Sequence, residues 1–189
     1  MSMSTGMMTK RIAEASPRLK ARIAGVFYLL AVLTGVFVEF IVRGRLGFAP
    51  ILIPVSCYIA ATLVLYDIFE VVDRRLSLLA ALFSIVVCTV GPLEWHPQGL
   101  DIGLMSLGCY CLLIGYLIFR STFLPRILGA LMAFAGLAWL TMLSAPLANY
   151  LSPYNLAGGI LGQLSLILWL LVMGVNAAQW QEKAADRRR

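Results

Sequence analysis

One stretch between Glu94 and Arg126 constrains the fold of the whole chain. It consists of a polar corner, EWHPQGLD, an apolar run of 18 residues from Ile102 to Phe119, and a short basic turn, RSTFLPR. At about 1.5 Å per residue, a helix formed by this run is roughly 27 Å long, close to the hydrocarbon thickness of a bilayer. Because backbone polar groups in lipid must be satisfied within the segment, we expect a membrane-spanning helix.

The same order of polar corner, apolar span and basic turn recurs along the chain. It predicts six spans, at residues 21–42, 48–72, 76–93, 102–119, 127–145 and 156–177. The composition agrees, because 61% of residues are hydrophobic and 13% are charged, against about 45–50% and about 25% in soluble domains. We therefore predict an all-α polytopic membrane protein: a cytoplasmic tail (1–20), a bundle of six transmembrane helices (21–177) and a basic cytoplasmic tail (178–189).

The lysines and arginines predict the orientation of these spans. If the N-terminus is cytoplasmic, Arg43 and Arg45 face the opposite side and the other 13 of the 15 basic residues face the cytoplasm. Cytoplasmic loops of membrane proteins carry such an excess. We therefore expect both termini to be cytoplasmic, in a bacterial cytoplasmic (inner) membrane. The asymmetry also explains the net charge of +6 without a nucleic-acid partner.

Small residues spaced four apart predict where helices pack closely. Gly158 and Gly162 open the sixth span, and Gly129 and Ala133 lie in the fifth. Such pairs let helix backbones approach in lipid, where no hydrophobic drive brings helices together. We expect packing within one bundle, with contacts between two copies as the alternative.

Several segments carry a resemblance to a known family. They are ARIAGVFYLL, VEFIVRG, GYLIFRSTFLPRILG, AGLAWLT and LSLILWLLVMGV. The chain resembles small bacterial integral membrane proteins known only as a domain of unknown function, family number 4386. The resemblance implies a six-helix membrane fold and no assigned activity. The chain departs from the family in the short segment 43–47 between the first two spans, and in Gln163, where the family often has an acid.

The outer face carries one candidate site for a ligand or ion, formed by Glu39, Glu94, His96 and Asp101. Ionisable residues near the hydrocarbon are costly and often functional, and histidine titrates near neutral pH. A small cation, a proton or a polar ligand could bind there. The structural alternative is a Glu39–Arg43 pair on one helix beside a solvated loop, with Asp101 as the N-cap of the fourth span.

The inner face carries a second group of charges. It comprises Asp67, Glu70, Arg74, Arg120 and Arg126. A proton relay is one interpretation, and a juxtamembrane network of ion pairs is the one we adopt. Within that network we expect Asp67 to pair with Arg120 or Arg126 from the neighbouring turn.

These patterns predict a non-enzymatic protein that acts through helix–helix contacts, either as an accessory subunit of a membrane complex or as a homo-oligomer. Its expected partners are the lipid bilayer and other membrane subunits or copies of itself. The four cysteines lie inside apolar runs, so we predict no metal and no cofactor. The alternative function is a small transporter or channel that uses the outer-face residues. An intramembrane enzyme is the least favoured class, since no nucleophile–base or metal-ligand set stands out.

Overall fold

The computed structural model describes residues 17–38, 49–90 and 101–186. In these ranges the regular structure is helical throughout, which confirms the all-helical fold class. The helices are α2 (Pro17–Phe37), the short 3₁₀ helix η2 (Ala49–Ile51), α3 (Leu52–Phe69), α4 (Arg74–Val90), α5 (Ile102–Arg120), α6 (Arg126–Thr141), α7 (Ala145–Leu151), α8 (Tyr154–Val172) and α9 (Ala177–Asp186).

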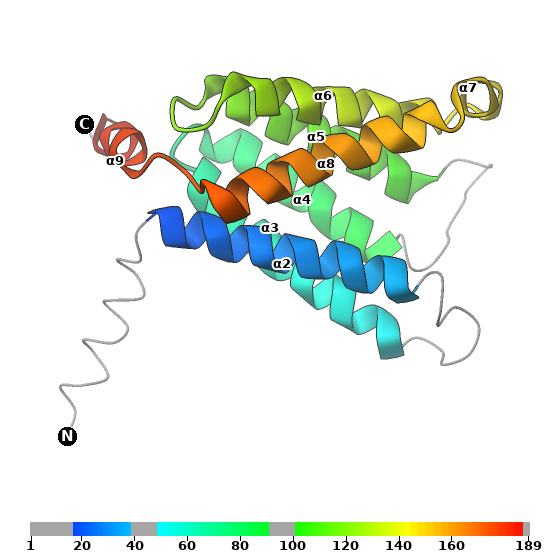
Figure 1. The fold of residues 1–189 in the computed structure, drawn as a ribbon, viewed down its shortest axis with the longest axis horizontal. Helices are drawn as coiled ribbons and strands as arrows, with labels where there is room; N and C mark the ends of the chain where they lie inside the picture. Colours follow the sequence, from blue (N-terminus) through cyan, green and yellow to red (C-terminus); the bar gives the residue numbers. More distant parts are fainter. Residues whose placement is uncertain (1–16, 39–48, 91–100, 187–189) are drawn as a thin grey trace.

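Within the described residues, the body of the molecule is formed by the long helices α2, α3, α4, α5, α6 and α8, and each runs antiparallel to the next along the chain (Figure 1). Helix α2 packs against α3, α3 against α4, α4 against α5, α5 against α6, and α6 against α8. Contacts between α8 and α2 close this order into a ring. The start of α2 and helix α9 lie at one end of the ring, and α7 lies at the other (Figure 1).

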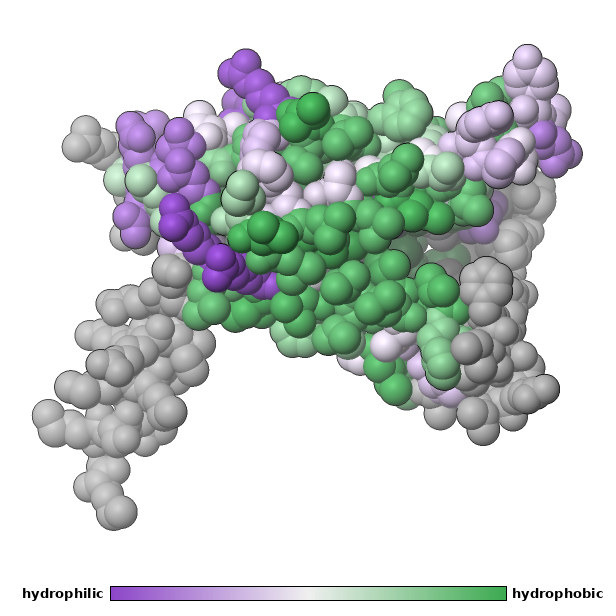
Figure 2. All heavy atoms as spheres, viewed as in Figure 1, coloured by the Kyte–Doolittle hydropathy of each residue, from purple (hydrophilic) through white to green (hydrophobic). Residues whose placement is uncertain are grey.

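The lengths and the apolar surface of these helices suit a membrane. In the described residues, α2, α3, α5 and α8 are each long and apolar enough to cross a bilayer, and α6 is a shorter apolar helix of 16 residues. Large apolar side chains point outward from the ring, among them Leu63, Ile127 and Leu161. Figure 2 shows this apolar surface along the middle of the molecule. Such an exposed apolar belt marks a membrane-facing surface.

Two aspartates fix where helices begin. The carboxylate of Asp101 accepts a hydrogen bond from the Leu104 N–H at 2.9 Å, so the predicted N-cap of α5 is confirmed. Before α4, the Asp73 carboxylate accepts from the N–H groups of Arg75 and Leu76, at 3.0 and 3.3 Å. Both side chains satisfy backbone donors that the first helical turn leaves unpaired.

Glycines set the spacing of α5, α6 and α8. An added Cβ at Gly115 would lie 2.9 Å from the backbone N of Ala133 and 2.9 Å from the backbone O of Gly129. A Cβ at Gly158 would lie 2.8 Å from the Phe134 ring, and one at Gly162 would lie 2.5 Å from the Ala135 Cβ. The small pairs expected to mediate packing therefore face helices of the same chain.

Two helices lie almost wholly outside the six predicted spans. Helix α7 falls in the predicted loop after the fifth span, with Pro146 in its first turn, where a missing N–H costs least. Helix α9 falls in the predicted polar tail. Helix α8 ends at Val172, earlier than the predicted residue 177, since Gly174 adopts φ +68°.

Candidate functional site

The predicted outer-face site lies largely outside the described residues. Glu39, Glu94 and His96 are not among them, and Asp101 is the N-cap of α5. The grouping of these four residues therefore stays a prediction.

The inner-face charges form two ion pairs within the part of the chain that the structure describes. Lys20 Nζ lies 2.5 Å from Asp67 Oδ2, with 23% and 44% of the two side chains exposed. Arg120 Nη1 lies 3.6 Å from Asp73 Oδ2. The predicted pairing of Asp67 with Arg120 or Arg126 is therefore wrong: α2 packs against α3 and brings Lys20 to Asp67.

The described basic residues share one end of the ring. The alternating helix directions bring the starts of α2, α4 and α6 and the end of α5 to the end where α9 lies (Figure 1). At that end are Arg18, Lys20, Arg22, Arg74, Arg75, Arg120, Arg126 and Lys183, which are all the lysines and arginines within the described ranges. The opposite end has Asp101 as its charged residue in the described ranges.

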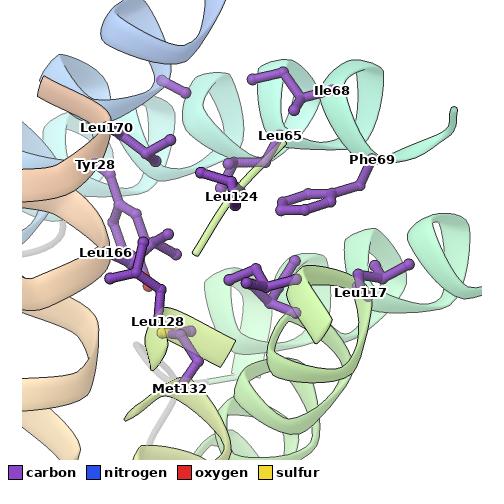
Figure 3. Close-up of a cluster of buried hydrophobic side chains, with 14 of the residues drawn as sticks. Tyr28, Leu65, Ile68, Phe69, Leu117, Leu124, Leu128, Met132, Leu166 and Leu170 are labelled. Atoms are coloured by element: carbon purple, nitrogen blue, oxygen red, sulfur yellow. The ribbon is translucent and has the colours of Figure 1, made fainter. Parts of the chain in front are cut away.

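Three tyrosines from three helices meet inside the ring. The rings of Tyr28 (α2) and Tyr58 (α3) lie 5.4 Å apart, edge to face, and those of Tyr58 and Tyr110 (α5) lie 6.2 Å apart. Tyr28 is only 1% exposed. Figure 3 shows it among Leu166 and Leu170 of α8. These three residues, called the tyrosine cluster (Tyr28, Tyr58 and Tyr110), bring three hydroxyl groups into the interior of the ring.

The hydroxyls of this cluster are not fully satisfied. Those of Tyr28 and Tyr58 are buried and make no hydrogen bond within the described structure. A buried polar group left unpaired costs about 1–3 kcal/mol. Nearby, Gln163 Nε2 of α8 lies 3.6 Å from Cys111 Sγ of α5, and is placed to donate to it. The hydroxyls of Tyr28 and Tyr58 therefore keep an unused capacity to donate or accept a hydrogen bond.

Sequence patterns did not predict the tyrosine cluster, because tyrosine counts as apolar in a span and the three residues come from separate helices. One signal was available: Tyr28 and Tyr110 lie well inside their spans, whereas tyrosines of membrane proteins gather at the interfaces. The described residues contain no group of three or more His, Cys, Asp or Glu side chains that could hold a metal ion.

The apolar helices and their outward-facing leucines define the class: a helical integral membrane protein. The predicted resemblance to family number 4386 is confirmed for residues 89–174, which the model of the family described as Domain of unknown function (DUF4386) matches. An uncharacterized protein of Archaeoglobus fulgidus is 27% identical over 127 residues, which cover 61% of this chain and 76% of that protein. No solved structure matches the chain.

Proposed function

We propose that the chain crosses a bacterial cytoplasmic membrane six times, with both ends in the cytoplasm. The six antiparallel helices of the ring support this topology, although α4 and α6 have only 17 and 16 residues. A helix of 16 residues is about 24 Å long, which a locally thinner bilayer or flanking polar residues can accommodate. The gathering of the eight described basic residues at one end supports the orientation.

The topology is tested with reporters fused to the full chain. Green fluorescent protein after Arg189 should fluoresce, and alkaline phosphatase at the same position should be inactive, because that enzyme requires the periplasm. Phosphatase inserted after Arg45 should be active. Phosphatase activity at both positions, or at neither, would contradict the proposed orientation.

For the role of the protein, we propose non-enzymatic action through helix contacts, as an accessory subunit of a membrane complex or as a homo-oligomer. The observation that carries this proposal is the close packing of α5, α6 and α8, which holds their outer faces in a fixed arrangement. The family match covers these same helices, so a role shared across the family would reside there. Leu137 and Leu161 are exposed on this part of the surface and offer apolar contact to another helix.

The test is the mass of the complex extracted in mild detergent from the membranes of the organism's own cells. A stoichiometric complex with itself or with another protein is expected, and Leu137→Trp with Leu161→Trp should disrupt it. The matched control is Leu63→Trp, which changes an equally exposed leucine on α3. A monomer in native extracts, or equal disruption by the control, would reject the proposal.

A second candidate function is a small transporter or channel, which the tyrosine cluster favours. Its unpaired hydroxyls lie inside the ring, where a small polar solute would lose its water. The outer-face residues Glu39, Glu94, His96 and Asp101 would form the entrance in this proposal.

This candidate is tested on the purified protein by thermal unfolding between pH 5 and 8, with and without Mg²⁺ or Ca²⁺. A ligand that binds the folded state raises its stability. A stabilisation by the cation that His96→Gln removes would support the candidate. Identical unfolding in all conditions would count against it.

A further inference from the structure

A cleft opens at the basic end of the molecule, between the turn that joins α3 to α4 and the helix α9. Its volume is about 630 Å³. Val71 and Val72 contribute apolar lining, and Arg74, Arg75 and Lys183 contribute positive charge. The cleft therefore combines an apolar wall with basic side chains at the end of a membrane-facing helix.

The positive charge of this cleft is available to a ligand. Arg74 and Arg75 are exposed, and neither forms an ion pair with another described residue. Two acids also line the cleft. Asp73 is already engaged by the first turn of α4 and by Arg120, whereas Asp186 is exposed and offsets part of the charge. The cleft therefore keeps a net positive charge, because three basic side chains line it against two acidic ones.

Lys183, the third basic side chain that lines the cleft, is held in place by the position of α9. The indole N–H of Trp180 donates a hydrogen bond to the backbone O of Ile68 in α3, at 3.1 Å. Trp180 also packs against the buried core of the bundle. Lys183 lies one turn further along α9, and it is less exposed than its neighbours Glu182 and Gln181. The helix thus holds Lys183 over the cleft, opposite the arginines.

A stripe of exposed leucines continues from the arginines along α4. Leu78, Leu79 and Leu82 are 50%, 41% and 51% exposed. They follow Arg74 and Arg75 at spacings of four residues, which places them on the same side of the helix. From Arg74 to Leu82 the helix rises about 12 Å. A positively charged helix start followed by an exposed apolar track matches the shape of a phospholipid, with its headgroup at the arginines.

We propose that this cleft is a binding site for an anionic phospholipid. Arg74, Arg75 and Lys183 bind the headgroup phosphate, and the acyl chains lie along the leucine stripe of α4. Guanidinium groups suit phosphate because their N–H donors match its oxygens in pairs. The inference rests on the proposed placement of the basic end at the membrane surface.

The test measures lipid binding to the full chain by native mass spectrometry from neutral detergent, with phosphatidylglycerol and phosphatidylcholine of matched acyl chains. Phosphatidylglycerol should bind more tightly. Each basic group near an anionic lipid contributes about fivefold in affinity, so Arg74→Gln with Arg75→Gln should weaken binding roughly 25-fold. Arg126→Gln is the matched control, because Arg126 is an exposed arginine at the same end that does not line the cleft.

Two further measurements distinguish a lipid site from faulty membrane insertion and from a site for free phosphate. Lys183 belongs to α9, outside the helices of the ring. The fivefold loss of lipid binding expected for Lys183→Gln therefore cannot arise from faulty insertion of those helices into the membrane. Excess inorganic phosphate should not displace the lipid; displacement would show a free-phosphate site and overturn the assignment to a lipid. Equal binding of both lipids, or equal loss in Arg126→Gln, would also overturn it. The reporter fusions test the topology separately, so a failed lipid site and a failed orientation give different results.

Discussion

Replacing Gly162 by alanine should loosen the contact between α8 and α6. A Cβ at this position would lie 2.5 Å from the Cβ of Ala135 and even closer to the backbone O of Leu131. Carbon atoms in contact are normally about 3.5–4.0 Å apart, so the two helices must separate by about 1 Å. A backbone carbonyl cannot move aside as a flexible side chain can. Overpacking of this kind costs about 1–3 kcal/mol.

Gly35→Ala is the matched control for this change. The nearest atom to a Cβ at Gly35 is the Pro54 Cβ, at an ordinary contact distance of 3.8 Å. Both glycines lie within helices, so the gain of about 1 kcal/mol in helix propensity from glycine to alanine applies to each. This gain cancels in the comparison. The difference between the two variants is therefore the overpacking cost, about 1–3 kcal/mol, with Gly162→Ala the less stable.

The assay is reversible unfolding in mixed micelles with an increasing mole fraction of sodium dodecyl sulfate, followed by the circular dichroism of both variants. Gly115→Ala should fall between them or near Gly162→Ala, because its Cβ would lie 2.9 Å from two backbone atoms of α6. If Gly162→Ala were as stable as Gly35→Ala, the close approach of α6 and α8 would not exist in the folded protein.

Three other contacts between or within helices can be tested in the same micelles. Lys20→Glu should destabilise the protein by less than about 1 kcal/mol, because the Asp67 side chain is 44% exposed. Adding Asp67→Lys to the same chain should restore the stability measured by micelle unfolding. Asp101→Ala should cost about 1 kcal/mol as a lost N-cap, and an Asp101→Ala variant as stable as the wild type would show that the cap contributes nothing. The hydroxyls of Thr62 (α3) and Ser84 (α4) lie 2.5 Å apart. A double-mutant cycle with Thr62→Val and Ser84→Ala should give a coupling free energy of about 0.6 kcal/mol. A coupling of zero would contradict the hydrogen bond.

The order of helices along the chain could be predicted from the sequence because lipid requires long apolar runs. Asp101 could also be identified as an N-cap from the sequence, because its partner, the N–H of Leu104, is only three positions away. Helix α7 was not predicted, because the predicted fifth span ends at residue 145, just before Pro146. Proline is equally suited to the first turn of a new helix, and the local sequence does not distinguish the two.

Contacts between helices could not be predicted in the same way. The partner of Asp67 depends on which helix lies beside α3, and the ring places α2 there, with Lys20, while Arg120 reaches Asp73. The tyrosine cluster depends on three helices meeting in the interior. A sequence records how far each tyrosine lies along its span, and it does not record which helices face one another.

The ring consists of two halves that are held together differently. Helices α5, α6 and α8 meet through glycines, so their backbones touch and permit little sliding. Helices α2, α3 and α4 meet through side chains, including the Tyr28–Tyr58 ring contact and the Thr62–Ser84 hydrogen bond. Packed side chains can change rotamer and so let the helices shift against each other. Two backbones in direct contact have no such adjustment.

The tyrosine cluster lies where these halves meet, since Tyr28 and Tyr58 belong to the first and Tyr110 to the second. Any movement of one half against the other would change the distances among these hydroxyls. The family match begins at residue 89 and ends at 174, so it covers the glycine-packed half. A property common to the family would then belong to that half.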